Sequence, residues 1–258
     1  MTYQTITYEL ADDIAVITLN RPAVMNALNS VMRPEITAAV TRAGAEARVL
    51  VLTGASPAFC SGQDLADPAL GPDLDMEGVL NGEYVPMLRA IFDSPIPTIA
   101  AVNGTAAGAG ANLALACDVV IASEAADFIQ AFSRIGLIPD AGGTYWLPRQ
   151  VGAARAMGAA LFAGKVTGRQ AADWGMIWEA VPDADFAAHW RSRARHLATG
   201  PTVAYRHLKT ALRASSENTL EAQLALEARL QGLCGETEDF REGVAAFLEK
   251  RPARYAGR

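Results

Sequence analysis

The chain has 258 residues, of which 51% are hydrophobic and 19% charged, a composition typical of a folded globular protein and not of a disordered one. Lysine and arginine number 22 against 28 acidic residues, and the net charge of −6 excludes a chain-wide basic surface for nucleic acid or anionic lipid. All 3 histidines, His189, His196 and His207, lie in the C-terminal third, which disfavours a Ser-His-Asp, Cys-His or His-rich metal site.

The cysteines and the first residues bear on location. Cys60, Cys117 and Cys234 are odd in number and form no CxxC pair, which favours reduced thiols and no structural metal. Residues 1–10 have neither the basic nor the apolar region of a signal peptide, and no apolar stretch is long enough to cross a bilayer. We therefore expect a cytoplasmic protein without a transmembrane helix.

Strands and helices alternate in the first half of the chain. β-Branched and aliphatic runs predict strands at residues 14–19, 49–53, 97–102 and 118–122. Helical periodicity predicts helices between them, from Ser30 as N-cap to about 47, from 76 to 92 and from 108 to 116. Residues 67–75, rich in proline and aspartate, are expected to form a mobile surface segment.

After residue 144 the chain becomes mainly helical. The pattern breaks at Gly152, Gly164 and Gly168, with one short strand expected at 177–181. From about residue 183 only helices are predicted, at 185–199, 202–214, 220–234 and 240–250. We divide the chain into an α/β body, residues 1–195, and a helical region, residues 196–258, whose last eight residues should fray unless a neighbour holds them.

Two glycine-containing segments offer backbone N–H groups for chemistry. In residues 103–112, a strand, a turn and the start of a helix leave donors free to polarise an oxygen that becomes negative, although small residues there equally fit close helix packing. In residues 59–65, a loop after a strand, Gly62 would free the N–H of Gln63 to point into a cleft. An ordinary connection with Asp64 as a helix cap is the simpler interpretation of that loop.

A lone carboxylate marks the third segment, residues 136–144. Asp140 lies between a proline and a glycine pair, with apolar neighbours that would raise its pKa and suit a general base near neutral pH. The alternative is a turn aspartate that caps the following helix.

These three segments, in this order, resemble the enoyl-CoA hydratase/isomerase (crotonase) superfamily, and the resemblance covers nearly the whole chain, from residues 20–22 to 246–251. Within it they are most similar to the ring 1,2-epoxyphenylacetyl-CoA isomerases, through the runs 60–65, 106–111 and 136–140 and Glu179 after 174–178. The resemblance implies an α/β fold with a crotonase-like β-β-α spiral core and a C-terminal helical region, 196–258, that builds homotrimers, often paired into hexamers.

The resemblance also implies the site. The substrate is an acyl-CoA, so that coenzyme A enters as part of the substrate and neither a cofactor nor a metal is needed. Asp140 is the implied acid/base, and the N–H groups of Gln63 and Ala109 hold the thioester oxygen. The implied substrate-binding residues are Ala23, Val24, Met25, Ser61, Asp64, Leu65, Gly108, Asn112 and Phe132, with Phe247 and Lys250 of a neighbouring subunit at the phosphorylated end of CoA.

One departure from the hydratases determines the expected reaction. Hydratases of this superfamily use two glutamates, and this chain has Asn112 and Phe132 at those positions. We therefore expect an isomerase that converts ring-1,2-epoxyphenylacetyl-CoA to oxepin-CoA through a thioester enolate, with Δ3,Δ2-enoyl-CoA isomerase activity. The alternatives are a straight-chain Δ3,Δ2-enoyl-CoA isomerase, an aryl-CoA dehalogenase and a non-catalytic scaffold that binds a partner or RNA. A dehalogenase of this superfamily also uses a His and a Trp, but this chain has no His in that half and has Phe132 at the Trp position.

Overall fold

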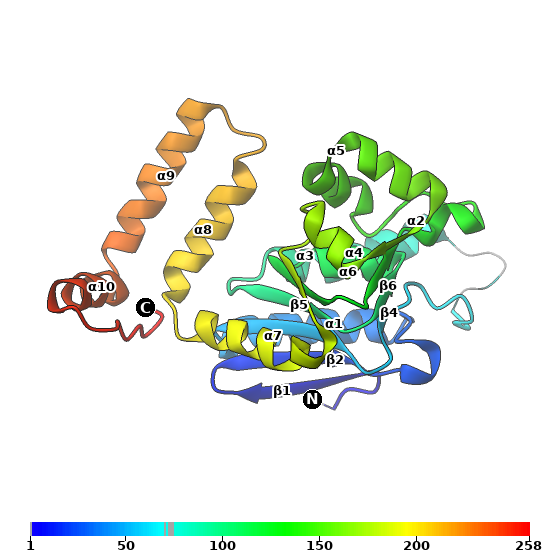
Figure 1. Ribbon diagram of the computed structural model, residues 1–258, viewed down its shortest axis with the longest axis horizontal. Helices are drawn as coiled ribbons and strands as arrows, with labels where there is room; N and C mark the ends of the chain where they lie inside the picture. Colours follow the sequence, from blue (N-terminus) through cyan, green and yellow to red (C-terminus); the bar gives the residue numbers. More distant parts are fainter. Residues whose placement is uncertain (1, 70, 72–74) are drawn as a thin grey trace.

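Two β-sheets carry the fold, and the chain moves repeatedly from one to the other. The computed structural model describes residues 2–69, 71 and 75–258 (Figure 1). One sheet has six strands, in the order β1 (Ile6–Ala11), β2 (Ile14–Leu19), β3 (Val49–Gly54), β5 (Thr98–Val102), β7 (Val119–Ser123) and β10 (Glu179–Val181). The other has four strands, in the order β4 (Ala58–Cys60), β6 (Thr105–Ala107), β8 (Asp127–Ile129) and β9 (Lys165–Thr167).

The connections form a β-β-α spiral. In each turn a long strand of the first sheet leads to a short strand of the second, as in β3–β4, β5–β6 and β7–β8, and a helical segment follows. The strands pair in parallel except β1 with β2 and β8 with β9. The α/β class and the spiral expected from the sequence are confirmed.

The helices cover both faces of the first sheet. In chain order they are α1 (Met32–Glu46), α2 (Met76–Val79), a π-helical turn (Leu80–Tyr84), α3 (Val85–Phe92), α4 (Ala109–Leu115), α5 (Gly143–Phe162), α6 (Gly168–Asp173), α7 (Asp183–Ala198), α8 (Thr202–Ala214), α9 (Leu220–Gly235) and α10 (Glu238–Glu249), with 3-10 turns at Pro22–Val24 and Ala131–Ile135. The expected helix 76–92 is therefore continuous but contains a π turn, and α5 has non-helical backbone at Gly152.

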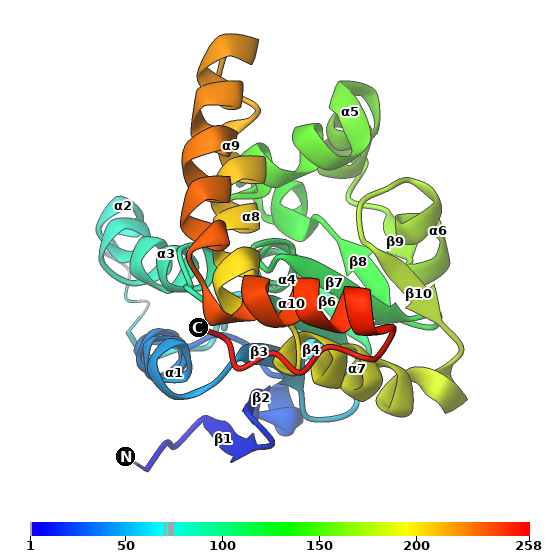
Figure 2. The ribbon, with the colours of Figure 1, turned by 90° about the vertical axis from the view of Figure 1, so that its left-hand side faces the viewer.

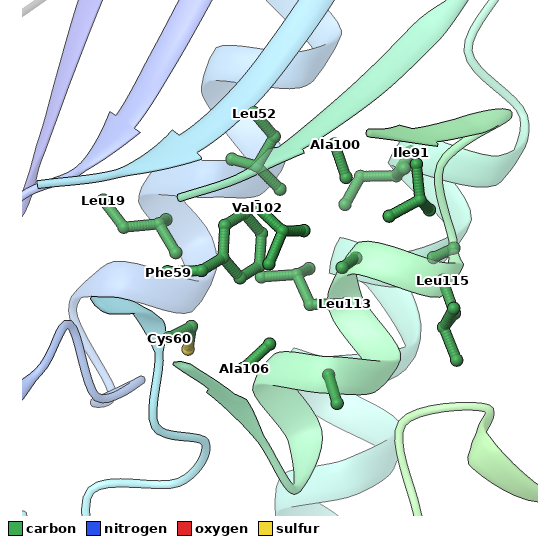
Figure 3. Packing of buried hydrophobic residues seen from close by; sticks show 14 of the residues in the cluster. Leu19, Leu52, Phe59, Cys60, Ile91, Ala100, Val102, Ala106, Leu113 and Leu115 are labelled. Atoms are coloured by element: carbon green, nitrogen blue, oxygen red, sulfur yellow. The ribbon is translucent and has the colours of Figure 1, made fainter. Parts of the chain in front are cut away.

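Alternate residues of the central strands point to opposite faces of the first sheet. In β3, Leu50 and Leu52 join a large cluster with residues of α1, α3 and α4, whereas Val49 and Val51 pack beneath α7. Figure 3 shows the large cluster, in which Phe59 of β4 lies among side chains of both sheets. The core therefore locks β4 and β6 beneath the first sheet, and the loops that follow them are fixed by this packing.

The start of α1 differs from the expectation. Ser30 is not the N-cap, because its N–H donates to the Asp67 carboxylate at 2.7 Å and the helix begins at Met32. The Asn29 side chain accepts the N–H of Met32 instead, at 2.9 Å. Asp67 is itself buried, at the start of the segment expected to be mobile; residues 70 and 72–74 of that segment lie outside the described residues.

The C-terminal helices form an arm. α8 and α9 run side by side away from the sheets. α10 packs against α9, at the outer edge of the molecule (Figures 1 and 2). Asp118, just before β7, ties the arm to the body through ion pairs of 2.7 Å with Lys209 and 2.5 Å with Arg213. No helix among the described residues is long and apolar enough to span a membrane.

The last eight residues are held by their own chain. The Asp239 carboxylate accepts the N–H groups of Ala256 at 2.7 Å and Gly257 at 2.9 Å, and the Arg48 guanidinium donates to the Tyr255 carbonyl at 3.1 Å. The expectation of a frayed end is therefore wrong. These hydrogen bonds join the last residues to Asp239 and Arg48, which are far away in the sequence. Composition alone does not reveal such pairings.

Candidate active site

Two glycines allow the loops after β4 and β6 to interlock. A Cβ added at Gly62, whose φ is +95°, would stand 2.7 Å from the Ala107 carbonyl oxygen and 3.4 Å from the nitrogen of Ala109. A Cβ at Gly110 would stand 2.3 Å from the Cys60 carbonyl oxygen. Since real side chains do not tolerate these approaches, glycine at both positions brings the 60–63 loop against the start of α4.

Two backbone donors result from this contact. Among the described residues, no acceptor bonds to the N–H of Gln63 or to that of Ala109, the first residue of α4. Gly108, which precedes α4, has φ 52° and ψ −129°, a conformation that requires glycine. The structure thus places two free N–H groups on adjoining loops, a pair able to bind one oxygen that develops negative charge.

Asp140 lies in the loop between the turn Ala131–Ile135 and α5. Its Oδ1 atom is buried and has no hydrogen-bond partner among the described residues. Burial raises the pKa of Asp140 to about 6. The side chain does not cap α5, whose N-cap is Gly142, so the alternative of a capping aspartate is excluded. A carboxylate with one unpartnered buried oxygen and this pKa suits acid/base chemistry near neutral pH.

Asn112 supports the Asp140 loop from below. Its side chain is fully buried, and its Nδ2 atom donates to the Asp140 backbone carbonyl at 2.7 Å. Its Oδ1 atom accepts a bond of 2.9 Å from Gln130. A Cβ at Gly143 would stand 2.4 Å from Asn112 Nδ2, so glycine is also needed here. In the position where hydratases have a glutamate, this chain therefore has an amide already bonded on both sides.

Residues expected to contact CoA line the outer side of the Gln63 loop. Ser61 of this loop makes two hydrogen bonds to the segment 23–25. Its N–H donates to the Met25 carbonyl at 3.0 Å, and its hydroxyl donates to the Val24 carbonyl at 3.2 Å. Ala23, Val24 and Met25, which follow one another in the chain, are exposed, and so is Leu65. This gives an open apolar rim next to the two free N–H groups.

The other expected binding residues divide into two groups. Phe132 is buried and its ring faces Gly108, 3.8 Å from the position of an added Cβ, whereas Asp64 is paired with Arg21 at 2.8 Å. Phe247 and Lys250 belong to α10 and its C-terminal end, in the arm, so one chain does not bring them to Asp140 (Figure 1).

Sequence reasoning missed the side chains that surround Gln63. Its Oε1 atom accepts hydrogen bonds from Arg33 at 2.9 Å and from the Tyr84 hydroxyl. The sequence does contain a signal for Arg33, because its spacing places it on the same helix face as Ile36 and Val40. That face is buried, and a buried charge requires hydrogen-bond partners. Tyr84 lies in an amphipathic helix and has no comparable signal.

Comparisons with known proteins show which proteins the chain is similar to. The enoyl-CoA hydratase/isomerase family model matches residues 9–258. The "probable enoyl-CoA hydratase" of Rhodobacter capsulatus is 64% identical over 100% of both chains, and the 1,2-epoxyphenylacetyl-CoA isomerase of Escherichia coli is 45% identical over 95% of each. The crystal structure of an enoyl-CoA hydratase from Bacillus anthracis, 31% identical, has a TM-score of 0.92 and covers 99% of this chain and 100% of its own.

Proposed function

The chain belongs to the enoyl-CoA hydratase/isomerase family, and from that premise we propose that it is an acyl-CoA isomerase that works through a thioester enolate. One observation carries the proposal. Asp140 is a half-buried carboxylate whose buried Oδ1 atom has no hydrogen-bond partner, and two free backbone N–H groups lie close together on the Gln63 loop and at Ala109, the start of α4. One base and two donors are sufficient to move a proton without adding or removing any other group.

The proposed substrate is ring-1,2-epoxyphenylacetyl-CoA. Asp140 takes a proton from C2, and the electron pair moves into the thioester to form an enolate whose oxygen accepts the N–H groups of Gln63 and Ala109. Opening of the epoxide and expansion of the ring follow, and Asp140 returns the proton, so the oxepin-CoA product is an isomer of the substrate. The 45% identity to the 1,2-epoxyphenylacetyl-CoA isomerase of Escherichia coli supports this substrate.

A straight-chain reaction uses the same groups. In a 3-enoyl-CoA, removal of the C2 proton gives the same kind of enolate, and its reprotonation at C4 gives the 2-enoyl-CoA. We propose this as a second activity, because it requires no group beyond Asp140 and the two N–H donors. Coenzyme A enters with the substrate, and the proposal requires no cofactor.

Hydration is not favoured, although the relative with 64% identity is named a probable hydratase. Addition of water needs groups that hold and deprotonate the water. At the two hydratase glutamate positions this chain has Phe132 and Asn112, and the Asn112 amide is bonded to Asp140 and Gln130. Asp140 is then left as the acid/base.

Three substrates separate these reactions. Purified protein is incubated with ring-1,2-epoxyphenylacetyl-CoA, a 3-enoyl-CoA and crotonyl-CoA, and the products are followed by mass and ultraviolet absorbance. We expect kcat/KM for the epoxide to be the highest and hydration of crotonyl-CoA to be at least 100-fold slower. A higher value for the 3-enoyl-CoA would make the ring reaction secondary, and a higher value for crotonyl-CoA would refute the isomerase proposal.

The rate of isomerisation is expected to fall in acid with an apparent pKa near that of Asp140, about 6. The base must be ionised to accept the C2 proton, and below pH 6 the carboxyl group is protonated. The measurement is kcat/KM against pH from 5 to 9 with the epoxide substrate, because this ratio reports the pKa of the free enzyme. A rate that stays constant down to pH 5 would show that another group is the base.

We also propose that the arm associates with other copies of the chain. α8, α9 and α10 enclose an apolar groove of about 1040 Å³ whose large side chains are exposed, among them Leu212 and Leu224. A surface of this kind is typical of an interface, and self-association would let α10 carry Phe247 and Lys250 to the CoA of a neighbour.

Leu212→Asp is expected to convert the oligomer into monomers, because it places a charge in this groove. Light scattering coupled to size-exclusion chromatography measures the mass. Leu10→Asp, an equal change at an exposed leucine of β1, is the control and should leave the mass unchanged. A wild-type protein that is monomeric at 50 µM, a concentration of the order at which weak interfaces form, would contradict the proposal.

A further inference from the structure

The Gln63 side chain is fixed by two donors from two different elements. Arg33 of α1 donates from Nη1 at 2.9 Å, and the hydroxyl of Tyr84 donates to the same Oε1 atom. The Gln63 Nε2 atom donates to the Asp64 carbonyl at 3.1 Å. The Oε1 atom thus accepts two hydrogen bonds and Nε2 donates one, so the amide is held in place inside the protein.

The Gln63 backbone is fixed as well. Leu28 lies beside it as a parallel bridge, and its N–H donates to the Gly62 carbonyl at 2.7 Å. The Leu28 carbonyl accepts the N–H of Asp64 at 3.0 Å. The peptide groups on both sides of Gln63 are thus held, and its own N–H, which has no acceptor among the described residues, is left to face outward.

Arg33 is a buried charged residue whose guanidinium bonds to three different segments. Its side chain is 1% exposed, and its Nε and Nη2 atoms each lie 2.7 Å from Glu83 Oε2. Its Nη1 atom also donates to the Leu28 carbonyl at 3.2 Å. Burying a guanidinium costs free energy of folding unless the group is paired and hydrogen-bonded. These partners therefore fix the position of the Arg33 guanidinium. Arg33 thereby joins α1, the Leu28 segment and the Gln63 loop.

Tyr84 is the second side chain that holds the Gln63 amide. It ends the π-helical turn Leu80–Tyr84, a conformation often found at functional sites. Its ring is 3% exposed and lies under the Arg33 guanidinium, 5.0 Å from the ring centre. Burial raises the pKa of the Tyr84 phenol; the charge of Arg33 opposes this and that of Asp140 adds to it. The phenol is therefore neutral near neutral pH and acts as a hydrogen-bond donor.

We propose that Arg33 and Tyr84 are positioning residues that orient the N–H of Gln63 toward the enolate oxygen. Neither touches the substrate; both act through the Gln63 amide, and Glu83 acts through Arg33. This inference rests on the proposed function, because it supposes an enolate between Gln63 and Ala109. Loss of the Tyr84 hydroxyl would leave the Gln63 side chain held by Arg33 alone, which also bonds to the Leu28 carbonyl. We expect the loop and its Leu28 bridge to tilt slightly, and an N–H donor displaced from its line to the oxygen stabilises the enolate less.

The test uses acetoacetyl-CoA, an acyl-CoA that enolises and whose enolate absorbs in the near ultraviolet. We expect wild-type protein to raise the enolate-to-keto ratio of the bound ligand above that of the free ligand. Tyr84→Phe should lower the bound ratio by about tenfold and kcat by a similar factor, with KM and the dissociation constant for CoA within about twofold. Tyr8→Phe removes an equivalent hydroxyl, bonded to Glu46 at 2.7 Å on the surface, and should change neither quantity.

A second variant separates positioning from stability. Gln63→Met removes the acceptor for both donors but keeps the backbone N–H, and it should lower the enolate ratio as Tyr84→Phe does. The double variant should then be little worse than either single one, since both remove one interaction. If wild-type protein raises the ratio but Tyr84→Phe raises it equally, the positioning role is refuted and the proposed function stands. If wild-type protein does not raise the ratio, the enolate site itself is refuted.

Discussion

Asp140→Asn is expected to lower kcat for isomerisation by about 10³-fold, because it removes the group that takes and returns the proton. The amide has nearly the same shape, and the support of the loop by Asn112 through the Asp140 carbonyl is retained. Turnover of the epoxide substrate by mass spectrometry measures the loss. Asp185→Asn, at an exposed aspartate in the first turn of α7, is the control and should keep full activity. Retention of more than a tenth of the rate would exclude Asp140 as the base.

The same variant should be more stable than the wild type at neutral pH. The native pKa of Asp140, raised to about 6 by burial, lies above the unfolded value, so the folded state is penalised when the carboxyl ionises. The penalty is absent below about pH 4, grows between pH 4 and 6 and is complete above that range. Removing the charge should therefore raise the free energy of unfolding by about 1 to 3 kcal/mol at pH 8, and by little at pH 4.

Thermal unfolding at equal protein concentration, recorded from pH 4 to pH 8, measures this gap. The control Asp185→Asn should show no gap that opens between pH 4 and 6. A wild-type protein that equals or exceeds Asp140→Asn in stability at pH 8 would mean that the carboxylate is not desolvated. Loss of activity together with a gain in stability is the expected signature of a catalytic group kept in an unfavourable environment.

The long strands β2, β3, β5 and β7 were predicted from the sequence because their β-branched and aliphatic side chains carry a strong signal, whereas β1, Ile6–Ala11, was not predicted. β2, at Ile14–Leu19, coincides with the expected strand, and β3, β5, β7 and β10 overlap theirs. The strands of the second sheet have three residues each and were missed, because so short a run shows no pattern by itself. Their conformation comes from the spiral, since each is paired to a neighbour one turn away. β10 is as short but lies inside the longer run 177–181, which was expected to be a strand.

The site divides in the same way. Asp140 and the glycines around Gln63 were located because local sequence signals them, a carboxylate among apolar residues and glycine where the backbone approaches itself. The interaction of Arg33 with Gln63 spans 30 residues, and its interaction with Glu83 spans 50. Pairings at such separations are decided by tertiary packing, which one sequence without the structure does not reveal.

Ala109→Pro should lower kcat by about 10² to 10³-fold, because it removes one of the two donors to the enolate oxygen. Ala109 is the first residue of α4, where proline fits the backbone and where no intrahelical bond uses the N–H. The change therefore deletes the donor and spares the helix. Asp140 keeps its environment, so the pH dependence of the remaining activity should still have its acid limb near pH 6.

Leu220→Pro is the matched control, since Leu220 is the exposed first residue of α9 and follows the N-cap Thr219. It should leave kcat unchanged. The dissociation constant of a saturated acyl-CoA shows whether the proline ring blocks the site, and it should change by less than about tenfold. The bound enolate ratio of acetoacetyl-CoA should fall in Ala109→Pro although the base is intact, which separates loss of the donor from loss of the acid/base. A kcat within fivefold of wild type would exclude the Ala109 N–H as a donor.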